Sequence, residues 1–305
     1  MKQFFCLALL ACLSAPASAR NKIVTRPKIT GIAGVGLAAI SLPADRKFYV
    51  QTLGWKAVPS IEASGGLRFY GVPLQWVEVL PATGRDQHPM RYIAFATSDA
   101  RQMRLYLAQH HVAVSPTVTR WKGGSQGFSV KDPEGNTVQF IQRGPWPAHI
   151  APSPRAISSQ MIHAGFMVRS APDEDGFYEK ILGFRPYWKG GMTDGATDFI
   201  SIQVPNGTDW IEFMVSVPSH PSHRELGVVD HFSLGVVNID TVVDKLSRRG
   251  WKPSPASRKQ MGRDGKYQLN LYDPDDVRVE FMQLLPTQKP CCSPFTGPQP
   301  QPEKF

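Results

Sequence analysis

Apolar and polar residues alternate along short segments of the chain, and these segments are separated by stretches with helical spacing. In the second half, residues 162–168 alternate as a strand does, and residues 174–182 predict a helix that ends at Gly183. Strand-like runs follow at 198–204 and 209–215. This order predicts a β-α-β-β-β module with one short strand not resolved. A second module has the same order, with a strand, a helix and two further strands at 230–237, 239–249, 267–272 and 277–284.

The chain also repeats itself at offsets that grow slowly from 129 to 141 residues. Residues 48–55 (FYVQTLGW) are echoed by residues 177–184 (FYEKILGF), and residues 132–142 match residues 273–283. The growing offset indicates small loop insertions between two homologous halves, each built from two modules. The predicted organisation is a signal peptide, an N-terminal half, a linker, a C-terminal half and a disordered Pro-rich tail at 1–19, 28–143, 144–157, 158–285 and 286–305.

The N-terminus has the pattern of a secretory signal. An apolar run at residues 4–13, too short to span a bilayer, precedes the small residues Ala17-Ser18-Ala19. We therefore expect an exported protein, periplasmic or extracellular, without a transmembrane segment. Acylation of Cys12 in a lipoprotein signal is a less favoured alternative. The adjacent Cys291 and Cys292 do not form a disulfide framework, and the sequence assigns them no role.

The net charge of +9 and the pI near 9.4 do not indicate a nucleic-acid partner, because the Lys and Arg residues are scattered along the chain. A small-molecule substrate is the expected partner. The oligomeric state stays open, with a homodimer as one alternative.

The repeated motifs resemble those of the vicinal-oxygen-chelate superfamily, which includes glyoxalase I, bleomycin resistance proteins and extradiol dioxygenases. The resemblance covers residues 29–285 and rests on a first strand that contains His, a helix with Phe-Tyr before Leu-Gly-Phe, and a last strand that reads Asp-Pro, five residues, Glu-Phe. It implies an α+β fold, in which four βαβββ modules pair into two U-shaped, half-barrel domains.

The resemblance also implies metal ligands on the first and last strands of each module, and in the C-terminal half these positions are His163, Glu212, His231 and Glu280. Their separations of 49, 19 and 49 residues fit a pseudo-symmetric site. Two imidazoles and two carboxylates suit one divalent ion, such as Zn, Ni, Co, Mn or Fe(II). Small residues share the strand face of both histidines and leave room for a ligand.

The corresponding positions in the N-terminal half are Gly34, Glu78, Tyr92 and Gln139. Only Glu78 is a good metal ligand, so we expect this half to be a degenerate domain that packs against the other half or shapes its pocket. A degenerate half can still bind an organic ligand.

Three functions follow from the resemblance. In the leading one, a glyoxalase-like lyase or isomerase chelates a substrate through vicinal oxygens, and Glu212 or Glu280 takes a proton from carbon. In the alternative, an extradiol-type dioxygenase holds Fe(II) by His163, His231 and Glu280. That family has a His before the Leu-Tyr of the last hairpin, and residues 261–270 contain none. A non-catalytic protein that binds a small molecule is the third hypothesis.

Overall fold

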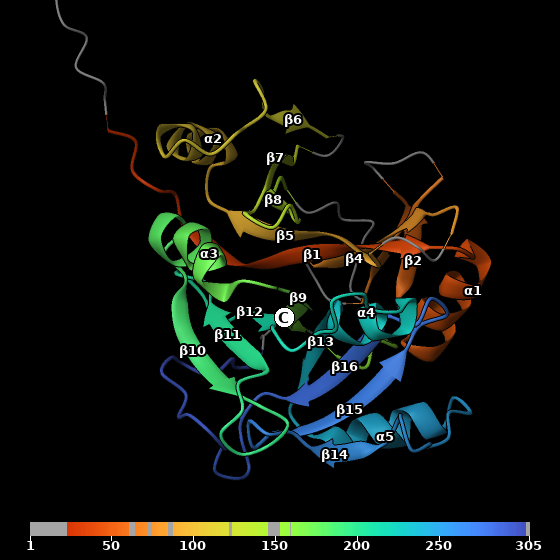
Figure 1. The fold of residues 1–305 in the computed structure, drawn as a ribbon. Coiled ribbons are helices and arrows are strands. Elements are labelled where there is room, and N and C mark those ends of the chain that lie inside the picture. Colours follow the sequence, from red (N-terminus) through yellow and green to blue (C-terminus); the bar gives the residue numbers. More distant parts are fainter. Residues whose placement is uncertain are drawn as a thin grey trace, which may run out of the picture.

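The computed structural model describes residues 23–60, 65–71, 75–84, 88–121, 124–145, 153–158 and 160–302. Two curved sheets of eight strands each lie side by side in it (Figure 1), with strand orders β2-β3-β4-β1-β5-β8-β7-β6 and β10-β11-β12-β9-β13-β16-β15-β14. The order is the same in both sheets. The predicted fold class, two half-barrel domains built from four modules, is confirmed.

Each sheet is formed by one half of the chain. The strands of the first sheet are β1 (Ile29–Ala39), β2 (Lys56–Pro59), β3 (Leu67–Tyr70), β4 (Trp76–Pro81), β5 (Met90–Thr97), β6 (Thr119–Arg120), β7 (Gln126–Lys131) and β8 (Thr137–Gln142). Those of the second are β9 (Gln160–Met167), β10 (Arg185–Gly190), β11 (Phe199–Gln203), β12 (Trp210–Met214), β13 (His231–Val236), β14 (Lys259–Met261), β15 (Tyr267–Tyr272) and β16 (Arg278–Gln283). The sequence pattern missed the edge strands β10 and β14.

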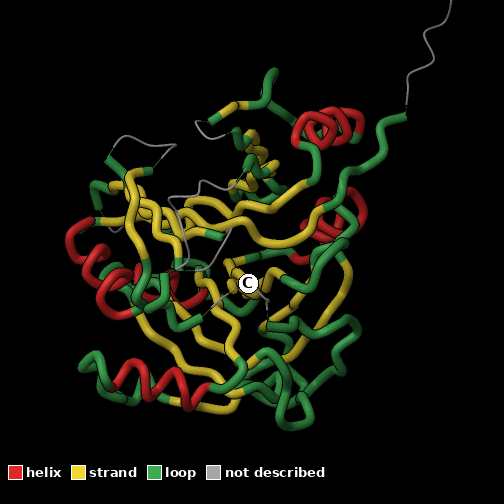
Figure 2. Tube along the Cα trace, turned by 180° about the vertical axis from the view of Figure 1, so that it is seen from behind, coloured by secondary structure: helices red, strands yellow, loops and turns green. Residues whose placement is uncertain are grey.

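Helices connect the first two strands of each module, except that α4 connects the two modules of the second half (Figure 2). They are α1 (Leu42–Lys47), α2 (Ala100–Gln109), α3 (Ala171–Asp175), α4 (His223–Val229) and α5 (Ile239–Ser247), with π-helical turns η1 (Phe48–Thr52) after α1 and η2 (Gly176–Ile181) after α3. The second of these turns is followed by Leu182 as its C-cap and then by Gly183, whose φ of +75° suits a residue without a Cβ. None of the described helices has the length and apolar character needed to cross a membrane.

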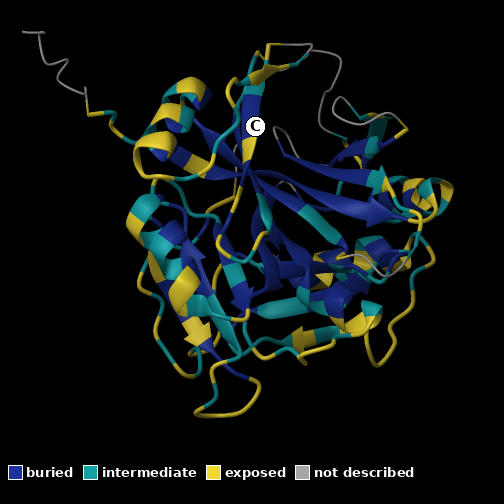
Figure 3. Cartoon of the chain, turned by 45° about the horizontal axis from the view of Figure 1, so that its top comes forward, coloured by how far each residue is buried: buried dark blue, intermediate teal, exposed yellow. Residues whose placement is uncertain are grey.

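Alternation along the strands divides the buried residues into three clusters. One face of each sheet contributes to a single core shared by both halves, which includes Phe95, Phe140, Phe213 and Phe232. The other faces carry smaller clusters, one around Trp76 in the first sheet and one around Trp210 in the second. Most central strands are therefore buried on both faces (Figure 3).

The two halves contact each other through residues at equivalent positions of the repeat. Tyr49 of η1 donates a hydrogen bond to Asp273 of the second half (3.1 Å), and Tyr178 of η2 donates one to Asp132 of the first half (3.2 Å). Tyr49 and Tyr178 stand at equivalent positions of the repeat, as do the two aspartates of the Asp-Pro motifs. Each half thus docks its first helix on the last hairpin of the other half.

The C-terminal segment has defined contacts with the second sheet, whereas its composition predicts disorder. Residues 286–302 lie along the second sheet, where Ser293, Thr296 and Gln299 hydrogen-bond to residues of β10. Its proline residues do not prevent this, because side chains of the segment supply many of the hydrogen bonds. The predicted signal peptide and Cys12 lie outside the described residues, as does much of the predicted linker.

Candidate metal centre

The strand register of the second sheet places the predicted site residues in two adjacent rows on one face. In the first row, Glu212 on β12 lies opposite Gly165 on β9, which lies opposite His231 on β13. In the second row, His163 on β9 lies opposite Ser233 on β13, which lies opposite Glu280 on β16. Each row therefore holds one His and one Glu separated by a small residue.

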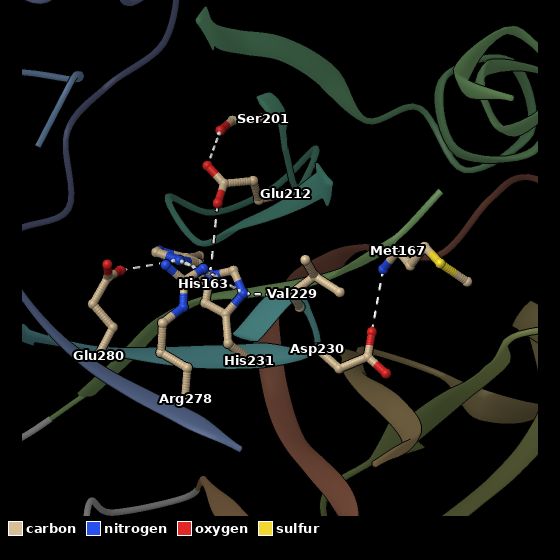
Figure 4. Close-up of polar contacts among 9 residues, drawn as sticks. All are labelled: His163, Met167, Ser201, Glu212, Val229, Asp230, His231, Arg278 and Glu280. Carbon is tan, nitrogen blue, oxygen red and sulfur yellow. Dashed lines mark hydrogen bonds and ion pairs between the residues drawn. The ribbon is translucent and has the colours of Figure 1, made fainter. Parts of the chain in front are cut away.

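Three of the four predicted ligands converge on one point (Figure 4). His163, His231 and Glu280 each offer a ligand atom, and these atoms lie within 4.8 Å of one another. The two Nε2 atoms are 3.0 Å apart, and His163 Nε2 is 3.3 Å from Glu280 Oε2. Glu212 stands beside this group, with Oε2 3.6 Å from His231 Nε2.

These spacings fit a divalent ion. Protein nitrogen and oxygen ligands lie about 2.0–2.2 Å from such an ion, so two neighbouring ligands at right angles are about 3 Å apart. The separation of the two Nε2 atoms matches this value. We conclude that His163, His231 and Glu280 can hold a divalent metal ion, whose species the spacing does not determine.

The surroundings of the histidines also suit metal ligands. His231 Nδ1 lies 2.8 Å from the carbonyl oxygen of Val229, and because a carbonyl can only accept, Nδ1 carries the proton. The lone pair of His231 is therefore on Nε2, which faces His163. A Cβ at Gly165 would lie 2.0 Å from the ring of His231, so glycine is required beneath it. Burial, and then the charge of Arg278, lower the pKa of both histidines well below the usual value. Both imidazoles are neutral, as metal binding requires.

Both carboxylates reach a cavity of about 390 Å³. Glu212 Oε1 accepts a 3.4 Å hydrogen bond from Ser201, and burial raises the pKa of Glu212 to about 8 and that of Glu280 to about 7. The rest of the lining combines polar side chains, such as Gln268 and Asn270, with a group of aromatic and methionine side chains that includes Trp188, Phe199, Trp210, Tyr272, Met192, Met214, Met261, Met282 and Phe295. The cavity suits a small ligand with an apolar body.

Arg278 is the main site residue that sequence reasoning did not assign. It lines the cavity, and its Nη2 lies 2.9 Å from both ring nitrogens of His231. Its position two residues before Glu280 on the same strand was a usable signal, because residues i and i+2 share a face. Phe295 also lines the cavity and comes from the C-terminal segment, for which the sequence contained no signal.

The equivalent place in the first half holds an ion pair. Glu78 is fully buried, 2.9 Å from Arg68 Nη2, and it accepts a 2.6 Å hydrogen bond from the hydroxyl of Tyr92. Arg68 also lies over the ring of Trp76, with its Cζ 4.4 Å from the ring centroid. The guanidinium of Arg68 therefore provides the positive charge beside Glu78, at the place that corresponds to the candidate metal centre of the second half. Of the other two projected positions, Gln139 is buried, and Gly34 packs against Trp76, where a Cβ would lie 2.5 Å from its carbonyl oxygen.

Comparisons with known proteins agree with this architecture. The chain is similar to a room-temperature structure of an extradiol ring-cleaving dioxygenase from B. fuscum, at 17% identity and a TM-score of 0.63 over 88% of this chain and 74% of that one. Homoprotocatechuate 2,3-dioxygenase from Brevibacterium fuscum, in complex with 3,4-dihydroxyphenylacetate, gives 18% identity and a TM-score of 0.64 over 90% and 84%. At these identities the likeness concerns the fold alone.

A search of curated proteins finds no match to this sequence. The profile of the Glyoxalase/Bleomycin resistance protein/Dioxygenase superfamily matches residues 31–140 and 160–281. The two matches correspond to the two half-barrel domains and leave out the C-terminal segment. The chain belongs to the Glyoxalase/Bleomycin resistance protein/Dioxygenase superfamily.

Proposed function

We propose that the protein is a metal-dependent enzyme that removes a proton from a small substrate held through two neighbouring oxygens. His163, His231 and Glu280 would hold the ion, which supplies Lewis-acid polarisation of the substrate oxygens when bound. One observation carries the proposal. Glu212 reaches the same cavity but stands outside the three-residue group, as a base in this site must.

The remaining residues of the cavity support this role. Glu212 in its ionised form takes the proton from carbon, and the 3.4 Å hydrogen bond from Ser201 to Oε1 leaves Oε2 to face the centre. Arg278 places a positive charge next to the substrate position, where negative charge develops after proton removal. The aromatic and methionine side chains exclude water, and the lower dielectric strengthens the interactions of the ion and of Arg278 with the negative charge that develops on the substrate.

A ring-cleaving reaction of the extradiol type is the second candidate. It is favoured by the ligand group itself, because two histidines and one carboxylate form the usual ligand set of non-haem Fe(II) oxygenases. The two neighbouring structures named above are dioxygenases of this type. Against it, the described residues that line the cavity include no histidine to serve as acid or base.

Metal content is the first test. We expect the protein, purified without an affinity tag, to bind one equivalent of a divalent metal, and His163→Ala, His231→Ala and Glu280→Gln to lose most of it. Glu212→Gln should retain the metal, and Glu225→Gln, on an exposed helix turn, serves as the control. Equal metal loss in Glu212→Gln and Glu280→Gln would contradict the division of roles between the two carboxylates.

Turnover separates the candidates. Small α-hydroxyketones in D₂O should exchange their α-hydrogen with the metal-loaded protein, observed by NMR, and Glu212→Gln should slow the exchange by about 100-fold or more. Bound iron together with oxygen uptake on simple catechols would instead support ring cleavage. Absence of metal after reconstitution would remove both enzyme candidates and leave a protein that binds a small molecule.

A further inference from the structure

Residues 287–299, here called the strap, lie across the open side of the second half-barrel. The outermost strands of that sheet are β10 and β14, at opposite ends of the strand order. At its start the strap binds the turn between β14 and β15, where the carbonyl oxygen of Gly265 accepts hydrogen bonds from the backbone N–H groups of Thr287 (2.8 Å) and Gln288 (3.1 Å). One end of the strap is thus fixed to one edge of the sheet.

The strap crosses to the other edge at Cys291 and Cys292, which form a disulfide with each other. The backbone N–H of Cys291 donates to the carbonyl oxygen of Arg263 (2.9 Å), in the turn between β14 and β15. The carbonyl oxygen of Cys291 accepts a hydrogen bond from Trp188 Nε1 on β10 (3.3 Å). A single residue therefore joins the two edges of the U-shaped sheet.

Beyond the disulfide, the strap is held along β10 by side chains of its own. Ser293 Oγ donates to the carbonyl oxygen of Lys189 (2.9 Å) and accepts from its N–H (2.9 Å). The N–H of Thr296 donates to the carbonyl oxygen of Tyr187 (3.0 Å), and the Tyr187 hydroxyl donates to Gln299 (2.7 Å). These specific contacts distinguish the strap from a loose tail.

Phe295, in the middle of the strap, covers the cavity. Its ring centroid lies 5.0 Å from that of Tyr187, and it lines the same cavity as Glu212 and Glu280. Phe295 also covers Lys266, whose Nζ lies 5.0 Å from the Phe295 ring and 4.7 Å from the ring of Trp210. Lys266 is completely buried, and its Nζ has no hydrogen-bond partner within the described chain.

We propose that the strap forms part of the outer wall of the cavity through Phe295 and that Phe295 limits the size of the substrate. The proposal deepens the proposed function and rests on it, because the ligand whose size is limited is the one bound at the metal centre. A volume of about 390 Å³ lies near the lower end of the usual range for ligand sites, so the loss of one phenyl ring from the wall changes the cavity substantially.

Size selectivity is tested with chelators that bind metal through two neighbouring oxygens. Co(II)-loaded protein is titrated with acetohydroxamate, benzohydroxamate and 2-naphthohydroxamate, and binding is followed by visible absorption. We expect the wild-type protein to bind the naphthyl compound at least about tenfold more weakly than the acetyl compound, and Phe295→Ala to abolish this difference. Leu285→Ala, a truncation at a half-exposed apolar residue outside the cavity, is the matched control.

A ratio of affinities that is the same in Phe295→Ala and in the wild-type protein would overturn the proposal. Binding of no hydroxamate by any form would instead refute the metal centre. In that case a second experiment, which needs no metal, tests whether Phe295 covers the cavity.

The second experiment is reductive methylation of the metal-free protein with formaldehyde and cyanoborohydride, read by mass spectrometry. We expect Lys266 to be protected in the wild-type protein and labelled about tenfold faster in Phe295→Ala. The exposed Lys252 is the internal reference for equal reagent access. Equally slow labelling of Lys266 in the two proteins would show that Phe295 does not cover the site.

Discussion

Arg278 and a bound metal ion compete for the space around His231. The guanidinium Nη2 lies 2.9 Å from His231 Nε2, where an ion would also approach. The guanidinium and an ion bound by His231 would be neighbouring positive charges, which repel each other unless solvent or carboxylates screen them. The arginine therefore reduces metal affinity in the absence of an anionic substrate, and an anion in the cavity relieves the repulsion.

Removal of this charge should increase metal affinity. We expect Arg278→Met to bind Zn²⁺ about tenfold more tightly than the wild-type protein, measured by competition with a chromophoric chelator. Arg258→Met removes one exposed positive charge elsewhere and should leave the affinity unchanged. An affinity of Arg278→Met equal to or below that of the wild-type protein would show that the arginine supports the centre.

The ion pair of the first half makes a separate prediction. Arg68 and Glu78 are both buried, so Arg68→Met leaves the Glu78 carboxylate buried without its cation. We expect this change to lower the free energy of unfolding by about 3–5 kcal/mol in urea denaturation. Arg68→Met combined with Glu78→Gln should recover most of the loss, because no uncompensated charge remains. A single variant as stable as the wild-type protein would contradict the role given to the pair.

At the scale of elements, α1 and α3 each bury a carboxyl group against the opposite half. Asp45 lies in α1 near Asp273 and Asp275, and burial raises its pKa to about 8. Glu174 lies in α3 at the equivalent position, near Asp132 and Glu134, and burial likewise raises its pKa to about 8. Both are protonated in the folded protein at neutral pH. The docking of each helix on the other half therefore depends on a proton.

This linkage predicts a loss of stability in alkaline solution. A carboxyl group whose folded pKa exceeds its unfolded pKa stabilises the fold fully below about pH 4, and the stabilisation falls as the pH rises towards 8. We expect the melting temperature of the wild-type protein to fall between pH 5 and pH 8. The melting temperature of the double variant Asp45→Asn/Glu174→Gln should fall less over the same range. At pH 8 the double variant should be the more stable protein. Parallel pH curves for the two proteins would refute the linkage.

At the scale of the whole molecule, the shared core makes the two halves interdependent. Rings from opposite halves touch within it, with centroid distances of 5.2 Å between Phe95 and Phe184 and 6.3 Å between Trp55 and Phe232. Separation of the halves would expose these apolar faces to water, at a cost of roughly 25 cal/mol per Å².

We therefore expect the isolated C-terminal half, residues 158–305, to lack a stable tertiary structure. Near-UV circular dichroism and urea unfolding measure this directly, and mixing with residues 20–157 should restore the signal of the intact chain. A cooperative unfolding transition of the C-terminal half alone would show that the first half is not needed for its fold.

The sequence by itself determined the modules and the strand positions of the four predicted site residues. Strand alternation and the repeat are local patterns, so His163 and Glu212 could be placed in one module, and His231 and Glu280 in the next. Once strands pair in register, residues at matching positions face one another, and the convergence of His163, His231 and Glu280 follows. The edge strand β14 escaped detection because a strand of 3 residues carries little periodic signal. The edge strand β10 has 6 residues, but its buried and exposed positions do not alternate.

Only the tertiary structure separated Glu212 from the three-residue group, because a difference of a fraction of an ångström between two carboxylates depends on neighbours such as Ser201 and Arg278. The tertiary structure also determined where the C-terminal segment packs. The partners of Phe295 and Ser293 are residues about 100 positions earlier in the chain. A Pro-rich segment with non-local partners has no period of its own, and its order comes from the surface that it covers.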